Sequence, residues 1–144
     1  MNGHRLGSVL RIRHLQERAA RGELAASRNV LRVAETAERT TWETLDERVA
    51  NPAAAPEAAS TALIATQMLV ASGMLAAERQ HVATVTAGEV VVHATEEWTL
   101  AARRVEGLER LVERQDIAAR EEAVRRASNE VDDLVLIKFA AGAS

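Results

Sequence analysis

Histidines are the residues of this chain that could most readily bind a metal or move a proton. There are four of them, His4, His14, His81 and His93. Imidazole nitrogens hold zinc when two histidines lie one helical turn apart or when a cluster of carboxylates joins them. The four histidines show no four-residue spacing and no acidic ligand cluster, and the chain contains no cysteine. We therefore expect no metal site and no disulfide.

Other patterns that carry chemistry are also missing from the sequence. No glycine-rich phosphate loop ends in Lys followed by Ser or Thr, no paired carboxylates mark a plausible pocket, and no nucleophile stands beside a histidine. We expect a protein that is not an enzyme and that takes no cofactor and no small-molecule ligand.

The composition indicates long helices with narrow apolar stripes. Hydrophobic residues make up 47% of the 144 residues, but aromatic residues only 2%, which is too few large rings for a thick core. Charged residues make up 27%, with both signs interleaved, and the net charge is −3. Phosphate binding needs a concentrated basic face, so we expect no nucleic-acid partner.

Two prolines divide the chain into two helical arms. Pro52 and Pro56 are the only prolines, and proline cannot continue a helix from the preceding residue. We expect a first arm over residues 8–50, a turn over 51–57 and a second arm over 58–138, forming one domain. The predicted fold is all-α, a two-helix antiparallel coiled-coil hairpin with a longer second helix.

The first arm carries a seam, a row of residues that alternate four and three positions apart and face a partner helix. Its first row contains leucines, with glutamates at two positions. Its second row lies three residues further on and contains small residues. The two rows are Leu10, Glu17, Leu24, Leu31, Glu38 and Leu45, and Ala20, Ser27, Ala34 and Thr41.

The second arm changes character along its length. Residues 58–77 carry no charge, but Ser, Thr and Gln interrupt the apolar residues, so we favour a wide apolar surface over a membrane span. Gly88 followed by three valines predicts a kink. A seam then follows, and after a phase slip a new heptad row begins. The seam comprises Trp98, Ala101, Val105, Leu108 and Val112, and the new row Ile117, Val124 and Val131.

Folding about a turn near residue 54 would place Leu45 near Leu63, Leu31 near residues 79–82 and Leu10 near Trp98. The second arm beyond about Arg104 would then have no partner within the chain. This stretch either folds back as a third helix or projects into another molecule, and we favour projection.

Several segments along the two arms form a recognisable set. Residues 9–13 open the first arm, and Leu24 and the Ala34-Glu35 pair follow along it. Residues 108–115 read Leu-Glu-Arg-Leu-Val-Glu-Arg-Gln, and residues 129–134 form a closing acidic segment. Together these segments resemble FliJ, the small coiled-coil component of the flagellar type III export apparatus, which usually has Asp-Glu where this chain has Asp-Asp in the closing segment. The resemblance covers nearly the whole chain.

The resemblance implies a helical hairpin similar to the central stalk of rotary ATPases. The end with both termini would bind the hexameric export ATPase, and the hairpin would bind the export gate protein FlhA. Substrate chaperones would be further partners. The implied gate-binding residues are Trp42, Leu45, Val49, Val70, Met74, Ala77 and His81. The implied ATPase-binding residues are Leu10, Leu108, Leu111, Arg114, Gln115, Asp132 and Asp133.

Alternatives to this reading remain open at the level of sequence. The chain could be a stalk subunit of a rotary ATPase, although such subunits carry an α/β domain between the arms, or a generic helical-hairpin interaction protein. A secreted WxG-type hairpin would need a Trp-x-Gly at the turn. Trp42 could equally be a seam residue. The opening residues contain no apolar run behind a basic residue, so we expect a cytoplasmic protein, peripherally associated with the inner face of the membrane.

Overall fold

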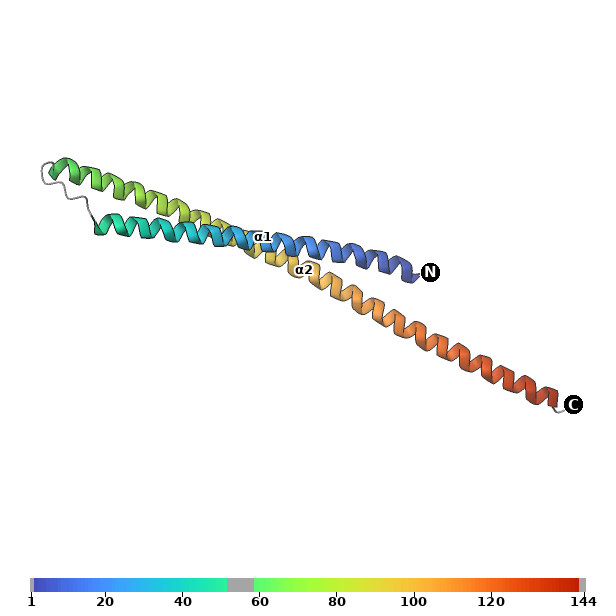
Figure 1. Cartoon of the computed structure of the whole chain (residues 1–144). Coiled ribbons are helices and arrows are strands. Elements are labelled where there is room, and N and C mark those ends of the chain that lie inside the picture. The colour runs from blue at the N-terminus through green and yellow to red at the C-terminus, as the bar shows by residue number, and fades with distance from the viewer. Residues whose placement is uncertain (1, 52–58, 143–144) are drawn as a thin grey trace. The chain divides into compact units, whose positions relative to one another are not determined.

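The chain folds as an all-α helical hairpin, as the sequence predicts. The structure is a computed structural model that describes residues 2–51 and 59–142, with side chains described for residues 5–51 and 60–142. Helix α1 spans Asn2–Ala50 and helix α2 spans Ala59–Gly142 (Figure 1). The described residues contain no strand.

Both helices are longer than the sequence analysis expects. Helix α1 begins six residues earlier than residue 8, and α2 continues four residues beyond residue 138. Helix α1 ends at Ala50, and the backbone N–H of Asn51 donates to the Glu47 carbonyl oxygen at 3.0 Å. This bond satisfies one of the carbonyl groups that a helix end leaves open. The turn with Pro52 and Pro56 lies outside the described residues.

The chain divides into two compact units, and each unit contains a segment of both helices. We call Arg18–Leu100 the hairpin unit, and Met1–Glu17 with Ala101–Ser144 the terminal unit.

In the hairpin unit the predicted seam is confirmed. Every residue of the two predicted rows of α1 that lies in this unit is at least half-buried. Leu24 and Leu45 are buried on α1, and Ala77 and Ala87 on α2. The covered positions of α2 also alternate three and four residues apart: Gly73, Ala77, Gln80, Thr84, Ala87, Val91, Ala94 and Trp98. The regular spacing in both helices makes the unit a coiled coil.

The two helices of the hairpin unit run antiparallel, but their alignment differs from the expected one. Leu45 packs at Gly73, and Glu38 contacts His81, so residue numbers rise on α1 as they fall on α2. The expected pairing of Leu45 with Leu63 is wrong by ten residues, and Leu63 is exposed. The small side chains at positions 73 and 77 leave room for the leucine, which the bulkier Leu63 would not.

Gly88 does not interrupt α2, contrary to the kink predicted there. The helix continues through this residue, and Ala87 and Val91 keep the phase of the seam on either side. A single glycine costs about 1 kcal/mol of helix propensity, which tertiary packing overrides.

In the terminal unit the paired stretch reaches further than Arg104, contrary to the expectation. Val105 is buried, Leu108, Leu111 and Val112 are half-buried, and His14 Nε2 lies 3.3 Å from Glu109 Oε1. The extra pairing follows the same shift in alignment that brings Leu45 to Gly73, because a partner on α2 about ten residues later places residues near His14 opposite residues near Glu109.

Beyond Val112 the helix has no cover from the other residues that the structure describes. Every side chain of residues 113–142 is exposed, including those of the heptad row Ile117, Val124 and Val131. The stretch therefore does not fold back as a third helix against other residues that the structure describes. Ile117 is five residues after Val112, which moves the apolar row away from the face that meets α1.

Helix α2 also contains a window of mean hydropathy 1.4 that meets the length and composition needed to cross a membrane. Only 11% of that window is buried. A single such helix is weak evidence of a span.

Candidate partner-binding surfaces

The seven residues implied for gate binding separate into covered and accessible ones. Leu45 is 5% exposed and Ala77 is 0% exposed, so both belong to the seam. Trp42, Val49 and Met74 are exposed, as is His81, and Val70 is half-buried. A partner that binds the folded hairpin would therefore contact the exposed residues and the half-buried Val70.

The accessible residues share one flank of the seam. A helix turns by about 100° per residue, so Trp42 and Val49 follow the seam positions Thr41 and Leu45 on one side. In an antiparallel pair, the corresponding side of the second helix carries Val70, Met74 and His81. The contact between Glu38 and His81, one from each helix, lies on this same side. We call the set Trp42, Val49, Val70, Met74 and His81 the aromatic flank.

A carboxylate in the seam organises the polar contacts of this flank. Glu38 Oε1 lies 2.9 Å from His81 Nδ1, and the Glu38 side chain is 19% exposed. The pKa of Glu38 is lowered, first by a hydrogen bond with Thr84, then by one with His81. Reduced hydration opposes this shift, while the His81 charge and a hydrogen bond from Trp42 add to it. The ionised carboxylate thus joins the two helices.

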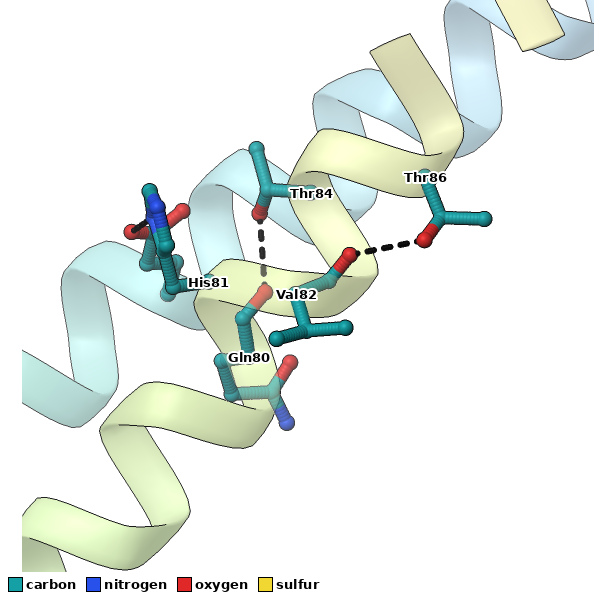
Figure 2. A network of polar contacts seen from close by, with 6 residues as sticks. Gln80, His81, Val82, Thr84 and Thr86 are labelled. Atoms are coloured by element: carbon teal, nitrogen blue, oxygen red, sulfur yellow. Dashed lines mark hydrogen bonds and ion pairs between the residues drawn. The ribbon is translucent and has the colours of Figure 1, made fainter. Parts of the chain in front are cut away.

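Threonine hydroxyls along both helices are satisfied by their own backbone. The Thr84 hydroxyl donates to the Gln80 carbonyl at 3.1 Å and that of Thr86 to the Val82 carbonyl at 2.9 Å (Figure 2). Thr84 is also the largest cause of the lowered pKa of Glu38. This local bonding explains how a helix rich in threonine leaves no unpaired hydroxyl in the seam.

Trp42 lies beside the seam and is exposed to solvent. Its side chain is 43% exposed, and it lies one helical turn after Glu38, whose pKa it helps to lower as the smallest of several causes. A large apolar surface of the ring remains open to solvent. Such an aromatic residue is suited to anchor a partner.

The other flank of the seam in the hairpin unit is an open groove. It is lined by small and polar side chains: Ala37, Thr40, Thr41, Thr44, Leu45, Arg48, Gly73 and Ala76. The groove lacks the convergent ionisable groups that a catalytic pocket needs. Among the described residues, no group of three or more His, Asp or Glu side chains could hold a metal ion.

The seven residues implied for ATPase binding lie in the terminal unit. Leu10, Leu108 and Leu111 are half-buried between the two helices, while Arg114, Gln115, Asp132 and Asp133 are exposed on α2. Other charges on this helix pair locally, Arg110 with Glu106 and Arg126 with Glu122, each one turn apart. These local pairs are the stabilising kind expected on a solvated helix face.

Sequence reasoning missed the contact between Glu38 and His81. A signal for it exists, because Glu38 occupies a leucine position of the seam and a carboxylate there needs a partner from the facing helix. The wrong alignment of the two arms concealed that His81 is this partner.

Comparison with known proteins gives one match. A family model described as "Flagellar FliJ protein" matches residues 1–144, the whole chain. No curated protein and no solved structure matches significantly.

Proposed function

The chain belongs to the FliJ family and is thus a component of the flagellar export apparatus, and we propose from this premise that it couples the export ATPase to the export gate. The terminal unit would enter the hexameric ATPase ring, and the aromatic flank of the hairpin unit would bind the cytoplasmic domain of FlhA.

The observation that carries this proposal is the uncovered stretch of α2. Residues 113–142 expose both an apolar row and a set of charged residues, Arg114, Asp132 and Asp133 among them. An isolated helix gains little stability from propensity alone, and most helices in proteins are held by packing of their apolar face. A partner that surrounds this stretch would supply that packing.

The second half of the proposal is supported by the aromatic flank. Trp42 comes from α1, and Met74 and His81 come from α2. All three are exposed and lie next to the seam between the two helices. An aromatic ring with apolar neighbours and a polar rim is the composition of an interface hot spot.

The same proposal assigns no catalysis to the chain. FliJ is a family of adaptors without enzymatic activity, so nucleotide hydrolysis would belong to the ATPase. Substrate chaperones would be further partners of the exposed helix surfaces. The chain would work in the cytoplasm, held at the inner face of the membrane through the gate.

A truncation tests the two halves separately. A chain that ends after Asp116 should no longer co-purify with the export ATPase, while it should still bind the FlhA cytoplasmic domain. As a matched control, Trp42→Ala in the full-length chain should weaken gate binding and leave ATPase binding unchanged. Unchanged ATPase binding by the truncated chain would reject the role given to the uncovered stretch.

A further inference from the structure

Helix α2 carries a second apolar row that α1 does not cover. The row comprises Ile64, Met68, Ala71, Leu75, Glu78 and Val82, all exposed, with successive spacings of four, three, four, three and four residues. Met68 is the most exposed of its large members, at 69%. Alternate spacing of four and three is the pattern of a coiled-coil seam. We call these residues the back row.

The back row faces away from both surfaces described above. Leu75 is two residues after Gly73, which rotates it by about 200° from the seam that meets α1. The aromatic flank lies between the two faces, at Val70, Met74 and His81. A helix bound on the back row would therefore form its own coiled-coil contact with α2.

The lack of charged residues along most of the back row restricts which kind of partner can cover it. Residues 60–77 contain no Asp, Glu, Lys or Arg, so the row offers no counter-charge over these five helical turns, and its one charged member, Glu78, follows directly after them. A charged helix that docked there would lose hydration without gaining an ion pair. A bilayer is a poor occupant too, because the segment has no basic residue to meet lipid headgroups and Thr66, Gln67 and Ser72 interrupt it.

The same segment of a second chain meets these requirements. We propose that the back row binds the back row of a second copy of this chain, antiparallel and about a two-fold axis. Alignment of Met68 with Ala71 of the second copy places a bulky side chain against a small one. The same alignment places Ile64 against Leu75 of the second copy and Thr61 against Glu78 of the second copy.

This alignment keeps charge out of the contact. Glu78 lies at its end, opposite the hydroxyl of Thr61, and Arg79 lies outside it. The alternative alignment, which places Ile64 against Val82 of the second copy, would put Glu78 against Met68. A buried carboxylate facing a thioether is unfavourable, so the first alignment is preferred. The contact is isologous, as the interface of a two-fold dimer must be.

The dimer is expected to be weak and reversible. Its core consists of four apolar layers from one pair of helices. The area that these layers bury is smaller than the interface area of stable dimers. It does not depend on the proposed export function, since its test uses the purified chain alone and needs neither ATPase nor gate.

Cross-linking tests the alignment. Because the chain has no native cysteine, a disulfide can form only between the introduced cysteines. Full-length Ile64→Cys mixed with full-length Leu75→Cys should form a disulfide-linked dimer under mild oxidation. Each variant by itself should stay largely unlinked, because the two copies of position 64, like the two copies of position 75, lie about 11 residues apart along the contact, or roughly 16 Å. Linking of Ile64→Cys with itself, or with Val82→Cys instead of Leu75→Cys, would overturn the proposed pairing.

Sedimentation equilibrium of the unmodified chain tests the association itself. The average mass should rise with protein concentration, and Leu75→Glu should raise the dissociation constant at least about tenfold by placing a charge in the contact. Val90→Glu changes an exposed valine of α2 outside the back row and should leave association unchanged. Circular dichroism confirms that both variants stay helical.

A monomer at every concentration would overturn the proposal. So would equal loss of association in Val90→Glu. Flotation of the chain with vesicles of zwitterionic lipid, abolished by Leu75→Glu in a chain that stays monomeric, would assign the back row to a bilayer instead.

Discussion

Leu45 occupies the space that a side chain at position 73 would need. A Cβ atom built on Gly73 would lie 2.7 Å from Leu45 Cδ1 and 3.8 Å from Leu45 Cγ. The close approach of α2 to this buried leucine sets the alignment of the two helices in the hairpin unit. A glycine at this position has two opposing effects. Its low helix propensity destabilises α2, whereas its lack of a side chain allows Leu45 to pack closely.

The effect of Gly73→Ala on the free energy of unfolding should therefore change sign between a chain with Leu45 and a chain with Leu45→Ala. Alanine is favoured over glycine by about 1 kcal/mol inside a helix, whereas an added methyl in a packed seam costs about 1–3 kcal/mol. In a Leu45→Ala background the clash disappears, so the substitution should be more favourable there by at least about 1 kcal/mol. Urea unfolding of the four chains measures this coupling. Gly88→Ala is the control, because nothing lies within 4 Å of its Cβ, and it should be stabilising in both backgrounds.

Trp42→Ala should reduce gate affinity more than stability. Loss of an exposed aromatic anchor costs on the order of 1–3 kcal/mol of binding free energy. Calorimetric titration with the FlhA cytoplasmic domain, beside a thermal melt of the same variant, separates the two effects. Trp42→Phe keeps a large aromatic ring at this position, so it should retain most of the affinity. Val33→Ala, at an exposed valine of α1, should change neither quantity. A large fall in melting temperature with unchanged affinity would assign Trp42 to the seam.

Glu38 should make the hairpin less stable in acid. Its pKa is lowered in the folded chain, so the ionised carboxylate contributes stability that is complete above the ordinary glutamate pKa of about 4.3. That contribution disappears as the pH falls through the lower pKa of the folded state. Glu38→Gln should thus melt below the parent chain at neutral pH, and the gap should close in acid. For Glu43→Gln, at an exposed residue of the same helix, no comparable gap is expected.

Ending the chain after Asp116 should leave its melting temperature nearly unchanged. The removed side chains are exposed, so the truncation uncovers almost no apolar area elsewhere. Ending the chain after Leu100 should lower the melting temperature clearly, because it also removes buried Val105 and the contact of Glu109 with His14. Thermal melts followed by circular dichroism compare the two. A marked loss of stability in the longer truncation would indicate that the final stretch packs on the rest of the chain.

The seam rows could be predicted from the sequence because periodicity decides which face of a helix is apolar. The row from Leu10 to Leu45 on α1 is covered as expected, and on α2 the row from Trp98 to Val112 has the expected spacing, although its part beyond Arg104 was expected to lack a partner within the chain. Periodicity says nothing about how far one helix slides along another. That alignment depends on which leucine meets which small residue, and the pairing of Leu45 with Gly73 is a property of both helices together.

The partner surfaces could be predicted only in part for the same reason. Trp42 and Met74 are accessible as a binding role requires, yet Leu45 and Ala77, drawn from the same stripes, are covered. A stripe with four and three spacing looks alike whether its partner is within the chain or outside it. The distinction needs the alignment, since a residue of one helix is covered only where the other helix reaches it.

The buried core in the described part of the chain consists of five hydrophobic residues, Leu24, Leu45, Ala77, Ala87 and Val105. Two of the five are alanines, so the apolar area removed from water is small and the free chain has a modest free energy of unfolding. In a cell, opened molecules are substrates for proteases, and the lifetime of a marginally stable chain depends on how often it opens. Binding to an assembled partner suppresses opening by mass action. Copies left without a place in the apparatus would be degraded first, which would match the abundance of the protein to the number of assemblies that hold it.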